Sequence, residues 1–120
     1  MKTILLLDDD PRHLEELGKF LEENGYDVCS CLNVSQAIRA IGELEVDFAI
    51  VDLFLEGNDG EELSNEFVAS VLIPANIPYG RMSSAPGLVP QEYSGKWVFD
   101  KRRFRKERDE FLKLLLSSLS

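Results

Sequence analysis

Two short apolar segments that each end in aspartate constrain the fold of this chain more than any other feature. Residues 4–7 form an aliphatic run followed directly by three aspartates at positions 8–10, and the apolar residues 48–51 are followed by Asp52. Short runs rich in aliphatic residues are typical of strands buried on both faces in a parallel sheet. Ligands of open α/β sheets bind beyond the carboxyl ends of the strands. We therefore expect the two strand ends to form one acidic pocket.

This acidic pocket predicts a metal site. Carboxylates at close range repel one another, and a pocket that gathers several of them usually holds a hard divalent cation, above all Mg²⁺. The aspartates at 8–10 could instead cap a helix that begins at Pro11. One aspartate is enough for capping, so three in a row favour the metal interpretation.

The rest of the chain alternates between strand-like and helix-like segments. A first helix is expected from Pro11 to a stop at Asn24-Gly25. The expected strands are residues 3–7, 26–32, 46–51, 77–83 and 96–100, and the other expected helices are residues 35–44, 61–72 and about 103–119. This order predicts a three-layer α/β domain. With the parallel strand order 2-1-3-4-5, the first and third strands are neighbours, which places residues 8–10 beside Asp52.

The fourth strand–helix unit departs from the pattern. Its expected strand contains Gly80 and Arg81, which are poor choices for a strand covered on both faces. Residues 86–90 then include two prolines and a glycine, which leaves little room for a helix. We expect the fourth helix to be shortened or missing.

The composition indicates one ordinary globular domain. With 120 residues, a hydrophobic fraction of 44% and a charged fraction of 29%, the chain suits a single domain spanning residues 1–120. The net charge of −9 argues against nucleic-acid binding by this domain. No apolar run reaches membrane-spanning length and no signal-peptide pattern is present, so a cytoplasmic protein with no membrane contact is expected.

Three further features have plain structural interpretations. The basic residues between Lys101 and Arg108 could contact a partner protein or an anionic surface, but a solvated helix face balanced by acidic neighbours is favoured. Cys29 and Cys31 are expected on opposite faces of one strand, with no disulfide between them. His13, in the first turn of a helix, is expected to be exposed to solvent rather than catalytic.

Two more polar residues are expected at strand ends on the same rim. Ser83 ends the fourth strand and Lys101 follows the fifth. A carboxylate nucleophile, a metal, a hydroxyl and an ammonium group together suit phosphoryl transfer. The cations neutralise the phosphoryl oxygens, the hydroxyl donates a hydrogen bond and the carboxylate attacks.

Over essentially its full length, the chain resembles the receiver domains of bacterial two-component response regulators. The resemblance rests on I-L-L-L-D-D-D-P at 4–11, V-D-L at 51–53, N-D-G at 58–60, the hydroxyl of Ser83 and Lys101. Each motif alone is weak evidence, but the acidic cluster, the acceptor aspartate and the downstream D-G are specific in combination. The resemblance implies a flavodoxin-like doubly wound (βα)5 fold.

The same resemblance implies a Mg²⁺ site and no other cofactor. Asp9 would bind the ion directly and Asp8 through water. Asp52 would be a further ligand, and the backbone carbonyl of Phe54 another. Asp10 matches the acidic residue that often follows the pair.

It also implies a phosphorylation switch. Asp52 would accept a phosphoryl group from the phosphohistidine of a sensor histidine kinase or a phosphotransfer protein. Ser83 would be the switch hydroxyl that moves onto the phosphoryl group, and Lys101 would pair first with Asp52 and then with a phosphoryl oxygen. The downstream protein partner stays unknown, and a homodimer is one option. Such a domain catalyses only its own phosphorylation and dephosphorylation and is not a turnover enzyme.

The sequence departs from the family pattern in its last part, on the surface through which a receiver usually signals to its partner. Arg102 stands where a proline usually follows the lysine, Val98 occupies the position of the usual aromatic switch residue, and Trp97 lies one position away. These departures suggest a receiver that still accepts phosphate but signals through a remodelled surface.

Two alternatives stay open on sequence grounds. A degenerate receiver would act as a phosphate-independent protein-interaction module. The departures from the family pattern favour this alternative, whereas the intact aspartates argue against it. A Mg²⁺-dependent phosphatase with an aspartate nucleophile usually carries a second aspartate two positions later, where this chain has Phe54.

Overall fold

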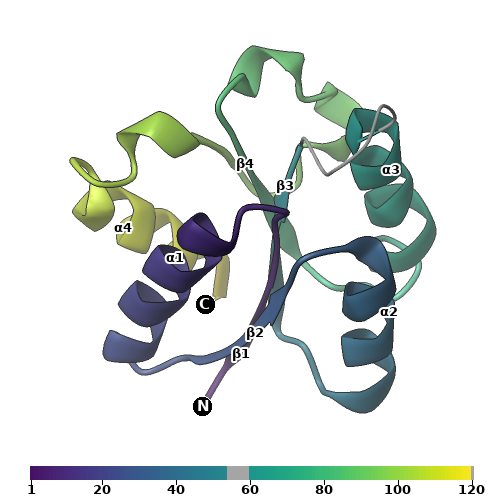
Figure 1. The fold of residues 1–120 in the computed structure, drawn as a ribbon, viewed down its shortest axis with the longest axis horizontal. Coiled ribbons are helices and arrows are strands. Elements are labelled where there is room, and N and C mark those ends of the chain that lie inside the picture. The colour runs from purple at the N-terminus through teal and green to yellow at the C-terminus, as the bar shows by residue number, and fades with distance from the viewer. Residues whose placement is uncertain (54–59, 120) are drawn as a thin grey trace.

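The computed structural model describes residues 1–53 and 60–119 and forms a parallel sheet covered by helices on both faces (Figure 1). The five strands occur in the order β2-β1-β3-β4-β5. They are β1 (Thr3–Leu7), β2 (Asp27–Cys31), β3 (Phe48–Asp52), β4 (Tyr79–Ser83) and β5 (Val98–Asp100). This arrangement is the flavodoxin-like α/β fold, and it confirms the predicted strand order.

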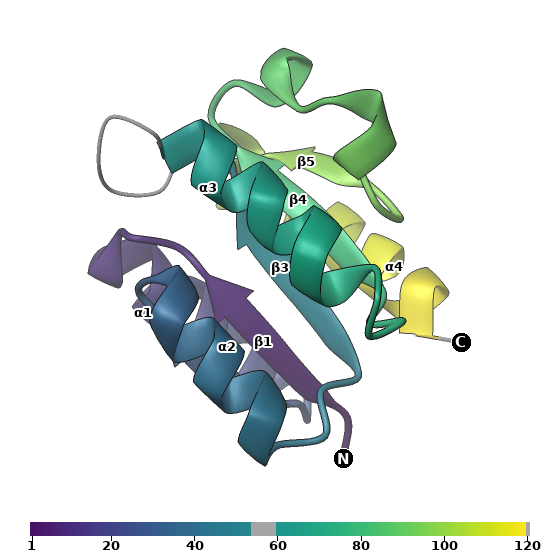
Figure 2. The ribbon, with the colours of Figure 1, turned by 90° about the vertical axis from the view of Figure 1, so that its right-hand side faces the viewer.

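In the described part of the chain, four α-helices form the two outer layers. They are α1 (Pro11–Glu23), α2 (Val34–Glu43), α3 (Gly60–Phe67), which continues as a π-helical turn at Val68–Leu72, and α4 (Arg108–Leu119). Helices α1 and α4 cover one face of the sheet, and α2 and α3 cover the other (Figures 1 and 2). The two faces bury separate apolar clusters, one with Leu14, Leu17 and Phe111 and the other with Ala37 and Phe67.

Strand β1 contributes to both clusters, which explains its continuous apolar run. Ile4 and Leu6 face the α1–α4 side, whereas Leu5 and Leu7 face the α2–α3 side. All four side chains are at most 1% exposed. A strand with polar residues at alternate positions would leave one helical layer without an apolar surface.

The helix ends follow local sequence signals. The Asp10 side chain accepts a hydrogen bond from the backbone N–H of Arg12, and Pro11 occupies the first helical turn of α1. Helix α1 ends at Asn24, and Gly25 adopts φ of 88°, in the left-handed region that glycine tolerates. One of the three aspartates therefore caps the helix, and Asp8 and Asp9 are left for other roles.

Strand β4 is buried along its whole length despite its composition. Gly80 is required because a Cβ atom there would lie 2.6 Å from the ring of Trp97. That ring stacks on Phe48 and meets Phe111 edge-on in the α1–α4 cluster. Arg81 faces the opposite layer and is 0% exposed. The two residues that look unsuitable for a buried strand each have a specific structural reason.

Two 3-10 turns, Pro86–Leu88 and Gln91–Tyr93, stand between β4 and β5, where a fourth crossover helix was expected to be shortened or missing. They lie beyond the sheet on the same side as α3 (Figure 2). This part of the prediction is confirmed.

The basic segment after β5 differs from the prediction. Helix α4 begins at Arg108 instead of about residue 103, and residues 101–103 form a 3-10 turn. The arginines of this segment are paired, but mostly not with the acidic residues that follow them: Arg103 pairs with Glu107 as expected, whereas Arg102 pairs with Asp100, and both Arg105 and Arg108 pair with Glu16 of α1.

The expectation for the cysteines was wrong. Cys29 and Cys31 lie on the same face of β2 with their sulfur atoms 4.0 Å apart, because residues two apart in a strand share a face. Both thiols are free, as expected. Among the described residues, no helix is both long and apolar enough to cross a bilayer.

Candidate functional site

The carboxyl ends of β1 and β3 bring three aspartates together. Leu7 pairs with Val51 in the parallel register, so the residues that follow them, Asp8 and Asp52, lie side by side at the sheet edge. Asp8 is 4% exposed and Asp52 is 5% exposed. One carboxylate oxygen from each of Asp8, Asp9 and Asp52 lies within 4.8 Å of the others. The acidic pocket expected from the sequence is present.

Asp8 is surrounded by hydrogen-bond donors. Its Oδ2 lies 2.7 Å from both Lys101 Nζ and His13 Nδ1, and its Oδ1 accepts from the backbone N–H of Asp10 at 2.9 Å. Burial raises the pKa of Asp8, but the hydrogen bonds from His13 and Lys101 more than offset it, so the pKa lies below its usual value. Asp8 is therefore ionised at neutral pH.

Asp52 has the opposite electrostatic character. Burial and the nearby charge of Asp8 raise the pKa of Asp52 to about 7, and Lys101, at 3.6 Å, offsets this only in part. Three carboxylates therefore lie close together, and the ammonium group of Lys101 lies beside two of them, Asp8 and Asp52. Hard divalent cations prefer oxygen ligands, so this donor set fits Mg²⁺.

Lys101 reaches the pocket although no proline follows it. It opens the 3-10 turn after β5, where the carboxylate of Asp100 accepts from the backbone N–H of Arg102. Burial lowers the pKa of Lys101, but the hydrogen bond to Asp8 and the charge of Asp52 raise it by more. The net pKa of Lys101 is therefore above the usual value. The ammonium group therefore stays charged between the two carboxylates.

Ser83 ends β4 on the same rim of the sheet. In the pairing of β3 with β4, Asp52 lies opposite Met82, so Ser83 is one position further along. Its side chain is buried, and its Oγ accepts from the backbone N–H of Ala85 at 2.9 Å. Phe54, whose backbone carbonyl was expected to bind the metal, lies outside the described residues.

The family model of the response regulator receiver domain matches residues 4–75, which carry the strand-end aspartates. The chain belongs to this family. The match ends before the fourth and fifth strands, the region in which the sequence departs from the receiver pattern.

Curated relatives of this receiver domain are response regulators. It is 37% identical over 76 residues to the response regulator GtcR of Aneurinibacillus migulanus, across 60% of this chain and 31% of that protein. It is 29% identical over 119 residues to the DNA-binding response regulator MtrA of Mycolicibacterium smegmatis, across 91% of this chain and 52% of that protein. The chain spans about a third to a half of the length of these relatives.

Solved receiver structures share the fold. The Vibrio cholerae chemotaxis protein CheY4 superposes with a TM-score of 0.78 at 19% identity, and 99% of each chain is covered. The Thermotoga maritima response regulator TrrA, solved in complex with Mg²⁺-BeF, gives a TM-score of 0.73 at 20% identity, over 95% of this chain and 99% of that one.

Sequence reasoning misjudged His13 and missed Ser64. The side chain of His13 is 11% exposed and bound to Asp8, so the expectation of a solvated histidine was wrong. The Ser64 hydroxyl, on α3, donates to the backbone carbonyl of Asp52. The position of His13 in the first turn of α1, close to the aspartates, could have indicated its contact with Asp8. No sequence feature near Ser64 indicates its hydrogen bond to Asp52.

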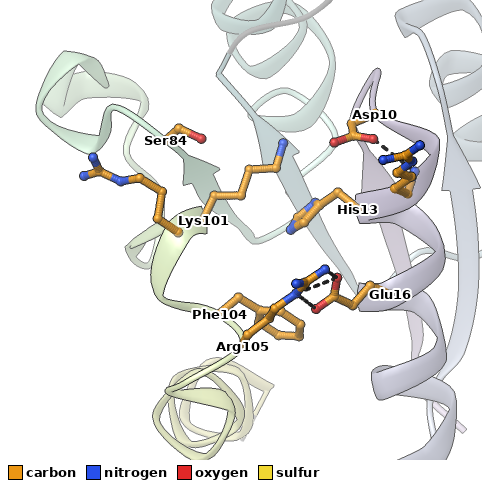
Figure 3. A pocket seen from close by; sticks show the side chains of 9 residues that line it. Asp10, His13, Glu16, Ser84, Lys101, Phe104 and Arg105 are labelled. Atoms are coloured by element: carbon orange, nitrogen blue, oxygen red, sulfur yellow. Dashed lines mark hydrogen bonds and ion pairs between the residues drawn. The ribbon is translucent and has the colours of Figure 1, made fainter.

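An open pocket of about 320 Å³ adjoins the acidic cluster (Figure 3). The side chains of His13, from α1, and Lys101, from the turn after β5, point toward one another across it. The other lining residues are Asp10, Arg12, Glu16, Ser84, Arg102, Phe104 and Arg105. This pocket borders the acidic cluster through His13 and Lys101, which both contact Asp8.

Proposed function

We propose that this receiver domain, formed by residues 1–120, accepts a phosphoryl group on Asp52 with Mg²⁺ held by Asp8, Asp9, Asp52 and the backbone carbonyl of Phe54. The observation that carries the proposal is the cluster of three carboxylates with Lys101 at the edge of the sheet. Family membership supports a histidine kinase or a phosphotransfer protein as donor. It also supports a downstream protein as receiver of the signal and a cytoplasmic location.

The residues of the site divide the chemistry between them. Bound Mg²⁺ supplies positive charge that favours ionised Asp52 and neutralises the phosphoryl oxygens. The Asp52 carboxylate is the nucleophile. Lys101 leaves its ion pair with Asp52 for a phosphoryl oxygen, and Asp8 stays ionised between Lys101 and His13. The hydroxyl group of Ser83 donates a hydrogen bond to the phosphoryl group.

The proposal includes no turnover of a free metabolite. The substrate is the phosphoryl donor; the bond from phosphorus to the donor's imidazole nitrogen breaks as the bond to the Asp52 oxygen forms, so the products are the phosphorylated domain and the donor with its histidine free.

Modification by acetyl phosphate, read by intact mass, tests the proposal. Wild-type protein should gain one phosphoryl group only when Mg²⁺ is present, and Asp52→Asn should gain none. The matched control is Asp27→Asn, an exposed carboxylate at the opposite end of the sheet, which should behave as wild type. Mass is preferable to Trp97 fluorescence because the indole does not lie next to Asp52. It stacks on Phe48 at the start of β3, whereas Asp52 is at the end of that strand.

A folded wild-type protein that takes up no phosphoryl group from acetyl phosphate in millimolar Mg²⁺ would contradict the proposal and support a phosphate-independent interaction module. Steady release of phosphate from a generic phosphomonoester would support the phosphatase instead.

A further inference from the structure

Arg81 is a buried cation that the phosphoryl-transfer chemistry does not use. It is 0% exposed in the middle of β4. Burial lowers the pKa of Arg81 by more than the neighbouring Tyr79 and Asp52 raise it, which leaves a net pKa of about 10, so the guanidinium is charged at neutral pH. A buried charge is costly unless its hydrogen bonds are satisfied. The contacts that satisfy Arg81 therefore indicate what it holds in place.

One edge of the guanidinium holds the strand that carries Asp52. Nε donates to the backbone carbonyl of Val51 at 3.3 Å, and Nη2 donates to Ser64 Oγ at 2.7 Å. The Ser64 hydroxyl donates in turn to the backbone carbonyl of Asp52. Arg81 is thus linked, directly and through Ser64, to the backbone carbonyls of the consecutive residues Val51 and Asp52.

The remaining nitrogen holds the segment that replaces the fourth helix. Nη1 donates to the backbone carbonyl of Tyr93 at 3.0 Å and to Asn65 Oδ1 at 3.1 Å. Tyr93 ends the 3-10 turn Gln91–Tyr93 and packs against the α2–α3 cluster. A single rigid, planar group therefore joins the end of β3, helix α3 and this turn.

The charge at Asp52 acts on this group. Asp52 stabilises the charged form of Arg81, and in a buried environment such an interaction is weakly screened. We expect an added negative charge at Asp52 to attract the guanidinium of Arg81 more strongly toward β3. The hydrogen bond from Nη1 of Arg81 to the carbonyl of Tyr93 should weaken as a result.

We propose that Arg81 is a positioning residue that couples the charge at Asp52 to the 3-10 turn Gln91–Tyr93. The inference rests on the proposed function for the event that changes this charge, namely phosphorylation of Asp52. The turn is then the part of the surface that differs between the two states.

Amide hydrogen exchange at Tyr93 and Ser94 measures the coupling, because these N–H groups form the turn's own hydrogen bonds. In wild-type protein at constant Mg²⁺, beryllofluoride adds negative charge and should speed exchange about two-fold or more. Asp52→Asn removes charge without phosphate and should slow exchange.

Arg81→Met and Arg81→Lys should abolish both responses while the protein still binds beryllofluoride. Arg81→Met removes the charge at similar length. Arg81→Lys keeps the charge but replaces the planar guanidinium, which bonds to β3 and to the turn at once, with a single ammonium group. This variant therefore tests the inference even if Arg81→Met does not fold. The matched control is Arg103→Met, an exposed arginine paired with Glu107, which should respond as wild type.

The outcomes separate the two proposals. Bound beryllofluoride, detected by fluorine NMR, with no change at Tyr93 overturns the role of Arg81 and leaves the acceptor intact. Absence of bound beryllofluoride, with an Arg81-dependent effect of Asp52→Asn, overturns the acceptor and supports the coupling. Equal responses in wild type and Arg81→Lys overturn the coupling.

Discussion

Asp8 and Asp52 show how two equally buried carboxylates acquire opposite properties. Three donors, from His13, Lys101 and Asp10, contact Asp8, and they hold its pKa below the usual value. Within the described residues, the Asp52 side chain has the longer contact with Lys101, and burial together with the charge of Asp8 raises its pKa to about 7. The number of donors, and not the degree of burial, decides which carboxylate carries the unfavourable charge.

The raised pKa makes Asp52 a source of instability in metal-free protein. Between its ordinary pKa of 3.8 and about 7, the folded state binds a proton that the unfolded state has released, so stability falls as the pH rises through this window. At about pH 8, Asp52→Asn should raise the free energy of unfolding by up to about 4 kcal/mol, with little effect near pH 4.

Urea denaturation in EDTA at the two pH values checks this prediction. Asp8→Asn is the matched comparison and should destabilise the protein at about pH 8, because a lowered pKa contributes stability that is lost only in acid. Destabilisation by Asp52→Asn at alkaline pH would show that the charge of Asp52 is not the dominant factor.

At the scale of elements, β4 shows how packing overrides strand propensity. Glycine is normally weak in a strand, yet Gly80 lies under Trp97 and no side chain fits there. The absence of a Cβ atom allows the indole to lie over the strand and to donate from Nε1 to Ser118 at 3.0 Å. This contact joins the residue just before β5 to α4.

Gly80→Ala should therefore destabilise the protein by about 1–3 kcal/mol, because a methyl group there forces Trp97 out of place. Gly42→Ala is the matched control: Gly42 lies in α2 with nothing near its missing Cβ, and alanine should stabilise the helix by about 0.5–1 kcal/mol. Denaturant unfolding measures both, and equal effects of the two substitutions would contradict the packing explanation.

At the scale of the whole molecule, the site joins otherwise separate parts of the fold. Asp8 and Asp9 follow β1, Asp52 ends β3 and Lys101 follows β5. A cation held by the three aspartates bridges segments far apart in the sequence. Binding to the folded state alone stabilises the whole domain by mass action.

Mg²⁺ should therefore raise the unfolding free energy of the wild type, by about 1.4 kcal/mol at ten times its dissociation constant. Asp9→Asn should remove most of this gain, because it removes one anionic ligand. Thermal unfolding with and without Mg²⁺ provides the measurement, and Na⁺ at equal ionic strength is the control. An equal gain in Asp9→Asn would place the binding site elsewhere.

Sequence patterns were sufficient for the strand order, the ends of the first helix and the meeting of the aspartates, because each depends on local signals and on the edge geometry of a parallel sheet. They were also sufficient for the loss of the fourth helix, since proline forbids it locally. The error on Cys29 and Cys31 was one of applying the period-two rule, which itself places them on one face.

The contacts of His13, Ser64 and Arg81 depended on the folded structure. Arg81 is separated by 17 residues from Ser64 and by 30 from Val51, and no local pattern specifies such partners. Only the packing of β4 against β3 and α3 brings the guanidinium of Arg81 to the backbone of β3 and to Ser64. Its partners are set by which side chains meet across the layers, a property of the whole fold and not of any segment.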